Sequence, residues 1–239
     1  MRGTWTVFKK EFREFFTSPT GYIYLVVFLV LTQWLFFRGF FVIGQASLRG
    51  YFSLLPWVFL LFIPAITMRS WAEERRNGTL EVLMTLPLRD PEILAGKFLA
   101  GFAFVVLSLL LTLPLPVSVS FIGNLDWGQV LASYLGALFL AGAYLSIGLF
   151  ASAISMNQIV AFLLGAVFVF LFFLIGMDWV LVTFPPQVAA VLQYFGLGYH
   201  FESIARGVID LRDVLYYLSV MAVFLYLNLR SMEIWRLGG

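Results

Sequence analysis

The chain alternates between long uncharged runs and short charged segments. The uncharged runs cover residues 21–37, 51–68, 98–125, 127–177 and 214–229. Runs of this length are typical of transmembrane helices, because about 20 apolar residues cross a hydrocarbon core of about 30 Å. The run 127–177 is too long for one crossing and must turn. We expect the turn at its polar segment, which contains Ser152, Ser155, Asn157 and Gln158.

This pattern predicts an all-α integral membrane protein with six transmembrane helices. Ser18-Pro19 is a favourable helix start, and Asp126 with Gln129 resembles a capping box. Pro114 and Pro116 predict a kinked or unwound end in the third helix. We place the six helices at residues 20–43, 51–69, 91–122, 127–153, 157–182 and 212–231 of a single transmembrane domain that spans residues 1–239.

Lysine and arginine indicate the orientation. If the N-terminus is cytoplasmic, only Arg38, Arg49, Arg206 and Arg212 of the 15 Lys and Arg residues lie outside. Cytoplasmic loops of membrane proteins carry an excess of Lys and Arg. We therefore predict that both termini are cytoplasmic, which requires an even number of spans. We expect a multi-pass protein of the bacterial cytoplasmic membrane.

Residues 4–17 form an amphipathic segment before the first span. Aromatic residues recur at helical spacing on one face of this segment, and charged residues occupy the remaining positions. We therefore predict a helix in the cytoplasmic interface, in contact with membrane lipid. Two interpretations remain open: a simple anchor, or an elbow that carries motion into the first span. The aromatic face consists of Trp5, Phe8, Phe12, Phe15 and Phe16.

Residues 71–87 belong to the only sizeable charged loop, between the second and third predicted spans. Gly78 can adopt a backbone conformation that other residues resist. Leu80, Leu83 and Met84 then share one face of a short helix, which Pro87 ends. The apolar stripe either dips into lipid or inserts into a groove on a soluble partner.

Residues 183–211 are too apolar for a solvated loop. Pro185-Pro186 breaks the fifth helix, and we predict one or two short outer re-entrant helices before helix six. The segment is interpreted either as an outer gate or as packing over the bundle. His200 fits a structural role at the outer interface, and Glu202 with Arg206 fits a helix-surface pair. The candidate gate residues are Tyr199, His200, Glu202 and Arg206.

Composition supports a membrane protein and excludes several chemistries. The 239 residues are 62% hydrophobic and 12% charged, against about 25% charged in soluble domains. A net charge of +2 gives no case for nucleic-acid binding, and the chain has no cysteine. Charges run through Glu14, and the following apolar run is too long for a typical signal peptide, so we expect no cleavage. Candidate transport-path residues are few: Thr32, Gln33, Ser108, Thr112, Ser118 and Ser133.

No catalytic machinery is visible in the sequence. There is no phosphate-loop pattern, one histidine, and no acid deep in any predicted span. We expect no catalytic residues, no metal site and no cofactor bound by this chain. A self-contained secondary carrier or intramembrane enzyme is therefore the least favoured hypothesis. The scarcity of polar path residues favours a lipid-like or amphipathic substrate over a wide hydrophilic channel.

Two segments resemble a known family. The sequence WAEERRNGTLEVLMTLPLRDPEILAGK resembles the coupling loop of type-2 ABC transporter permeases, in which a short helix fits a cleft of the ATPase. The sequence HFESIARGVIDLRDVLYYLSV, from His200 to Val220, resembles the gliding-motility permease branch, the GldF-like proteins. The likeness covers nearly the whole chain.

The resemblance implies a permease subunit of an ATP-driven exporter. Its expected partners are a cytoplasmic ABC ATPase dimer that binds ATP and Mg, a second permease copy or sister permease, and a GldG-like auxiliary protein. The alternative is a non-transporting scaffold that transmits force to an extracytoplasmic partner. The chain itself is then not an enzyme. Met84 joins the coupling residues through its place on the stripe, and those that match the family motif are Glu73, Glu74, Gly78, Thr79, Leu80, Glu81, Leu83 and Pro87.

Overall fold

The computed structural model describes residues 2–43 and 47–237. This part of the chain folds into thirteen helices without a strand, in agreement with the predicted all-helical class. The long helices are α1 (Arg2–Thr17), α2 (Pro19–Ile43), α3 (Arg49–Thr67), α6 (Asp90–Leu110), α8 (Trp127–Ala153), α9 (Gln158–Leu174) and α13 (Leu211–Leu237). The short helices are α4 (Ala72–Arg76), α5 (Thr79–Thr85), α7 (Pro114–Ser120), α10 (Asp178–Leu181), α11 (Pro186–Phe195) and α12 (Leu197–Ala205).

Five helical segments of the described chain are long and apolar enough to cross a membrane. The predicted span at 157–182 is the one not among these five: it corresponds to α9, an apolar helix of 17 residues that is shorter than the others. Length and composition therefore identify a multi-pass membrane protein. The five segments are Pro19–Phe41, Arg49–Arg76, Asp90–Ser120, Trp127–Ala153 and Leu211–Arg236.

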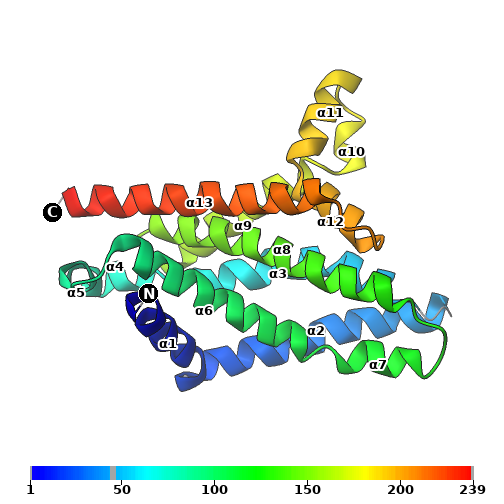
Figure 1. Cartoon of the computed structure of the whole chain (residues 1–239), viewed down its shortest axis with the longest axis horizontal. Coiled ribbons are helices and arrows are strands. Elements are labelled where there is room, and N and C mark those ends of the chain that lie inside the picture. Colours follow the sequence, from blue (N-terminus) through cyan, green and yellow to red (C-terminus); the bar gives the residue numbers. More distant parts are fainter. Residues whose placement is uncertain (1, 44–46, 238–239) are drawn as a thin grey trace.

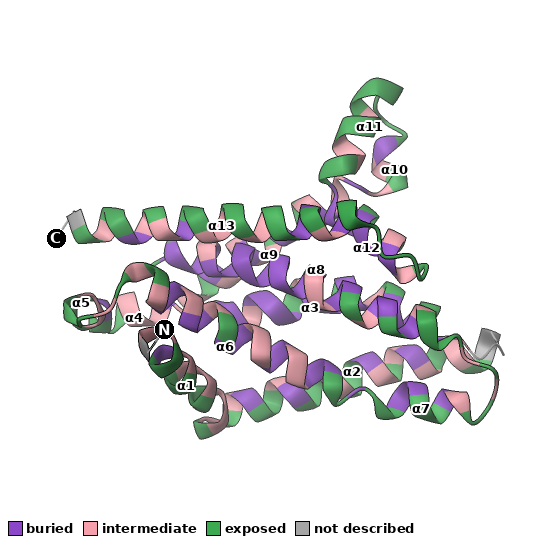
Figure 2. Ribbon diagram, viewed as in Figure 1, coloured by how far each residue is buried: buried purple, intermediate pink, exposed green. Residues whose placement is uncertain are grey.

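The helices form an elongated bundle around α8 (Figure 1). Helix α8 packs against α3, α6, α9, α12 and α13. Its small residues allow close approach: a β-carbon at Gly148 would lie 2.3 Å from Oγ1 of Thr67 on α3. Figure 2 shows buried residues concentrated on α8 and α3, whereas the outward faces of α2 and α13 are largely exposed, as lipid-facing surfaces are.

Both termini lie at one end of the bundle, together with α1, α4 and α5 (Figure 1). We call this the terminal end. Helices α7 and α12 lie at the other, distal end, where α10 and α11 project sideways from the bundle (Figure 1). Helix α11 buries none of its residues, whereas α12 buries Leu197, Phe201 and Ile204. Helix α12 therefore packs over the bundle, as one of the two interpretations of this segment expects. Helix α11 does not.

Local signals place several helix ends. Asp126 Oδ1 accepts a hydrogen bond from the Gln129 amide nitrogen at 3.1 Å, and Asn157 Oδ1 accepts one from that of Ile159 at 2.9 Å. The Gln129 side chain does not complete the predicted capping box, because its amide donates to the Ala205 carbonyl at 2.9 Å. It therefore ties α8 to α12.

Two predicted helices are interrupted. The segment predicted at 91–122 divides into α6 and α7, with α7 beginning at Pro114. The segment predicted at 157–182 ends at Leu174 and restarts at Asp178. Here the chain crosses itself closely, since a β-carbon at Gly176 would lie 2.7 Å from Cα of Gly196. The sequence does not reveal such a crossing because the two glycines are far apart along the chain.

Candidate coupling site

Lys97 is the central residue of the terminal end. It lies on α6, and its side chain is only 1% exposed. Its ammonium group donates to Oε1 of Glu11 on α1 at 3.0 Å and to Oε1 of Glu74 on α4 at 2.9 Å. It also donates to the carbonyl of Ser70, at 2.8 Å. One buried cation thus joins the N-terminal helix, the loop before α5 and a long helix of the bundle; we call these contacts the Lys97 clamp.

The clamp balances its own charges. A buried cation is costly unless it is paired and hydrogen-bonded. Lys10 adds a second cation, 3.2 Å from Glu11 and 3.5 Å from Glu74, and the Trp71 ring lies 4.8 Å from the Lys97 ammonium group. Burial alone would raise the pKa of Glu11, but Lys97 and Lys10 outweigh it and hold that pKa below its ordinary value. The Glu11 carboxylate is therefore positioned to stay ionised.

Helix α4 is fastened to the end of α8 as well. Ser152 Oγ accepts hydrogen bonds from the backbone nitrogens of Trp71 at 3.1 Å and Ala72 at 3.2 Å, and donates to the Met68 carbonyl at 3.1 Å. Arg75 donates to the Ala153 carbonyl at 3.1 Å. These bonds satisfy the free N–H groups at the start of α4. The loop is thus anchored to two helices of the bundle, to α6 through Lys97 and to α8 through Ser152.

The end of α13 closes the same site. The buried Trp71 ring packs 5.6 Å from the Trp235 ring, and the guanidinium of Arg75 lies 5.0 Å from that ring. Arg236 pairs with Asp90, at the start of α6, at 2.7 Å. Segments far apart in sequence therefore meet at the root of the loop.

Helix α5 follows Gly78, which has a φ of +69°. This left-handed conformation favours glycine, as the sequence suggests. The helix ends at Thr85, since Leu86 is extended before Pro87. Two turns of helix therefore project from the root of the loop.

The apolar stripe on α5 faces the chain's own residues at the root of the loop. Leu80, Leu83 and Met84 pack against the chain's own cluster around Trp71 and Met232. Leu80 is buried, whereas Leu83 and Met84 are partly buried. The exposed face of α5 instead carries Val82, which is 63% exposed, and the adjacent Leu86, which is 45% exposed. Thr79, Glu81, Thr85 and Pro87 are exposed as well, and Glu73 and Glu74 lie partly buried at the root.

A cavity of about 620 Å³ separates α5 from α1. Lys10, Glu11 and Glu14 of α1 line one side. Val82, Leu83 and Leu86 line the other, and the Lys97 clamp forms part of the floor. The exposed apolar residues of α5 therefore border a strongly charged hollow.

Helix α1 presents a second face that the sequence pattern did not reveal. Val7, Glu11 and Phe15 lie at i, i+4 and i+8 and face α6. A β-carbon at Gly96 would lie 2.6 Å from Cβ of Val7, and Phe15 stacks on Phe104 at 4.4 Å. Phe15, which the sequence places in the aromatic face, thus turns to α6. The other four rings form a ladder with centroid distances of 4.9, 5.6 and 5.3 Å along Trp5, Phe8, Phe12 and Phe16; Trp5 is exposed and the other three are partly buried.

The candidate gate residues do not form one site. His200 is buried, and its Nδ1 lies 2.7 Å from Oδ1 of Asp213 while its Nε2 lies 2.9 Å from the Tyr194 carbonyl. Tyr216 stacks on the ring at 3.9 Å. His200 therefore fastens α12 to α13. Tyr199 is at the surface, and Glu202 and Arg206 line a separate cavity.

The comparison with protein families decides the classification. The family described as "ABC-2 family transporter protein" matches residues 5–231, nearly the whole chain. The chain belongs to the ABC-2 transporter family. A search of the curated proteins gave no match. Membership identifies a membrane permease component of an ABC transporter, a class in which ATP hydrolysis belongs to a separate subunit.

Within this ABC-2 chain, four of the six candidate path residues are buried and make hydrogen-bond contacts inside the subunit. Thr32, Ser108 and Thr112 are buried and donate to carbonyls of their own helices, at 2.7, 2.9 and 2.7 Å. Ser133 is buried too and lies 3.4 Å from the Ala205 carbonyl. Side-chain hydroxyls of this kind stabilise helix packing in membranes.

Three residues of the terminal end were not singled out from the sequence. Lys97, Ser152 and Arg75 make contacts to residues distant along the chain. Lys97 carried a signal, because a charge just inside an apolar run needs a partner. Ser152 carried none beyond its place in the polar turn.

Proposed function

We propose that this chain is the permease subunit of an ATP-driven exporter, moved by a separate cytoplasmic ATPase that docks on α5. The observation that carries the proposal is the Lys97 clamp, which fixes the loop before α5 to α1 and α6. A push on α5 then reaches two helices of the bundle through buried contacts. The match of the whole chain to the ABC-2 family supports the same assignment.

The proposed topology has six spans with both termini in the cytoplasm. The two termini lie at the same end of the bundle (Figure 1), which an even number of crossings requires. Helix α9 supplies the sixth crossing: its 17 residues extend about 25 Å at 1.5 Å per residue. Interfacial residues and local thinning accommodate a short span of this kind.

We propose that Val82 and Leu86 are the docking residues for the ATPase. Burying one such side chain contributes about 1.5–3 kcal/mol. The charged cavity beside them, with Lys10, Glu14 and Arg69, suits the polar rim of an interface. The partners are an ATPase dimer holding ATP and Mg and a second permease, and the GldF-like motif at residues 200–220 adds a GldG-like auxiliary protein.

A force-transmitting scaffold is the second candidate. It is supported by Thr32, Ser108 and Thr112, which are buried and donate hydrogen bonds to backbone carbonyls of the same chain. Both candidates use the same clamp and the same docking face. Transport by the reconstituted complex in proteoliposomes distinguishes them.

Co-purification with a co-expressed cognate ABC ATPase tests the docking proposal. Val82→Asp is the informative variant because Val82 is exposed, whereas Leu83 packs into the chain's own core and its replacement would unfold the loop. Val208→Asp makes the same change at an exposed distal position and serves as the control. We expect Val82→Asp to reduce ATPase recovery at least tenfold and Val208→Asp to leave it unchanged. Equal recovery with both variants would refute docking on α5.

A further inference from the structure

A second cavity lies at the distal end and is distinct from the coupling site. It measures about 500 Å³ and is bordered by α3, α8, α12 and the end of α9. A neighbouring cavity of about 290 Å³ shares Arg49, Phe52 and Gln129 with it. Pockets of this size hold drug-sized ligands.

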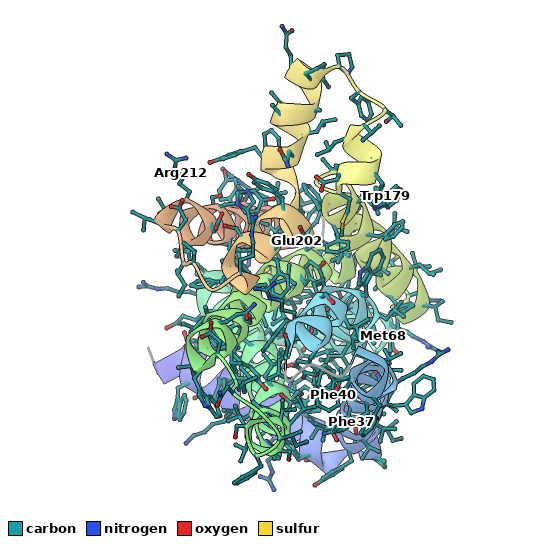
Figure 3. All side chains as sticks on the ribbon, turned by 90° about the vertical axis from the view of Figure 1, so that its right-hand side faces the viewer. Phe37, Phe40, Met68, Trp179, Glu202 and Arg212 are labelled. Atoms are coloured by element: carbon teal, nitrogen blue, oxygen red, sulfur yellow. The ribbon has the colours of Figure 1, made fainter. Side chains whose placement is uncertain are left out.

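One part of the distal cavity is cationic. Arg49 and Arg206 both line it, and in the described chain neither guanidinium pairs with a carboxylate. Glu202 is the one acid of the lining, so the lining carries net positive charge. Figure 3 shows Glu202 at the middle of the distal end, with Arg212 at its side, outside the cavity lining. Arginine is suited to phosphate and carboxylate through its fork of N–H donors.

The remaining lining is apolar and aromatic. Trp57 and Phe173 meet edge to face at 4.9 Å, and Phe52 and Phe201 are buried behind them. Trp57 is itself exposed, so the aromatic wall opens onto the outside of the bundle. An apolar chain can lie along this wall while its polar end stays at the arginines.

We infer that the distal cavity binds an anionic amphiphile, with its phosphate or carboxylate at Arg49 and Arg206 and its apolar chain along Trp57 and Phe173. Two unpaired guanidinium groups select the anionic headgroup, and the aromatic wall selects against a free anion. The inference goes beyond the proposed function, because binding here does not require the ATPase. If the chain exports a substrate as proposed, this cavity assigns it to the anionic amphiphiles.

Binding of fluorescent short-chain phosphatidic acid to the purified full chain in neutral detergent tests the inference. The Arg49→Gln/Arg206→Gln double variant should weaken binding at least tenfold, and Trp57→Ala should weaken it several-fold. Arg212→Gln and Trp179→Ala are matched controls at exposed distal positions outside the lining, labelled in Figure 3, and should bind like the wild type. Unlabelled phosphatidylglycerol should compete, and phosphatidylcholine should not.

Three outcomes would overturn the inference. Equal competition by phosphatidylcholine would show that the headgroup charge is not read. Competition by millimolar inorganic phosphate as strong as by lipid would identify a free-anion site. Unchanged binding in the double variant would place the lipid elsewhere. A photoactivatable phosphatidic acid on the wild-type chain checks the site without a variant: adducts on Trp57 or nearby residues of α3 support it, and adducts confined to α2 or α13 contradict it.

Discussion

The ammonium group of Lys97 lies 2.9 Å from Oε1 of Glu74, although Glu74 precedes α5 in the chain and Lys97 follows it, on α6. The same ammonium group lies 3.0 Å from Glu11. The loop is therefore closed on itself and fastened to the N-terminal helix by one buried cation. The segment before α5 is therefore held in place on α1 and α6.

Replacing Lys97 with Met should strongly destabilise the terminal end. The change leaves Glu11 and Glu74 partly buried with only Lys10 nearby, and breaking a buried ion pair costs about 3–5 kcal/mol. Thermal unfolding in detergent, followed by size-exclusion chromatography, should show a clearly lowered midpoint. Lys9→Met removes an exposed lysine of α1, the helix that carries Glu11, and should have little effect. Equal midpoints for the two variants would contradict the role of the clamp.

Acidification should weaken the clamp through Glu11. The pKa of Glu11 is lowered from its ordinary value of 4.5, because Lys97 and Lys10 outweigh the effect of burial. A lowered carboxyl pKa stabilises the fold above the unfolded-state pKa, and this contribution is lost as the pH falls through the folded-state pKa. Thermal midpoints measured from pH 7 down to pH 3.5 should therefore fall below about pH 4.5, and Glu11→Gln should flatten this decline.

Glu14 supplies a control of opposite sign. Burial, together with the charge of Glu11, raises its pKa. Its ionised form therefore opposes folding at neutral pH, and Glu14→Gln should leave the midpoint equal or slightly higher there. A loss of stability in Glu14→Gln as large as that in Glu11→Gln would show that the two carboxylates are not distinguished by the clamp.

Ser152→Ala should loosen the loop at its other anchor. The hydroxyl accepts from two backbone N–H groups and donates to one carbonyl, and leaving buried groups unpaired costs about 1–3 kcal/mol. Hydrogen exchange should rise at residues 71–76. Ser155→Ala is the matched control, because that buried hydroxyl donates to Ala151 within the same helix end. Equal exchange in both variants would contradict the anchoring role.

Much of the fold follows from the sequence because lipid-facing helices show themselves as uncharged runs. The turn at Asn157 and the helix break at Pro114 are local effects of polar and proline residues. The direction of the α5 stripe was not predictable in the same way. Periodicity shows that Leu80, Leu83 and Met84 share a face, but not which apolar surface covers it.

The Lys97 clamp was missed for a related reason. Its partners are 86 and 23 residues away along the chain, and only the tertiary fold brings Glu11 and Glu74 to one atom. The interruption at Gly176 is similar, since it reflects a backbone crossing with Gly196. Long-range contacts of this kind leave no periodic pattern in a single sequence.

Gly148→Ala should disrupt the contact between α8 and α3. The added β-carbon would meet Thr67 Oγ1 at 2.3 Å, and overpacking of this kind costs about 1–3 kcal/mol. Gly50→Ala is the control, since a β-carbon there meets open space. The thermal midpoint should fall only for Gly148→Ala. No fall would show that the two helices separate easily.

The most direct measurement of the coupling proposal is a contact map of α5 in the assembled complex. The chain has no cysteine, so Val82→Cys gives a single thiol for a photo-crosslinking label, and Val208→Cys gives the distal control. With a cognate ABC ATPase co-expressed in native membranes, the proposal predicts a permease–ATPase adduct from position 82 and none from position 208. An ATPase that co-purifies yet is never cross-linked from position 82 would contradict docking on α5.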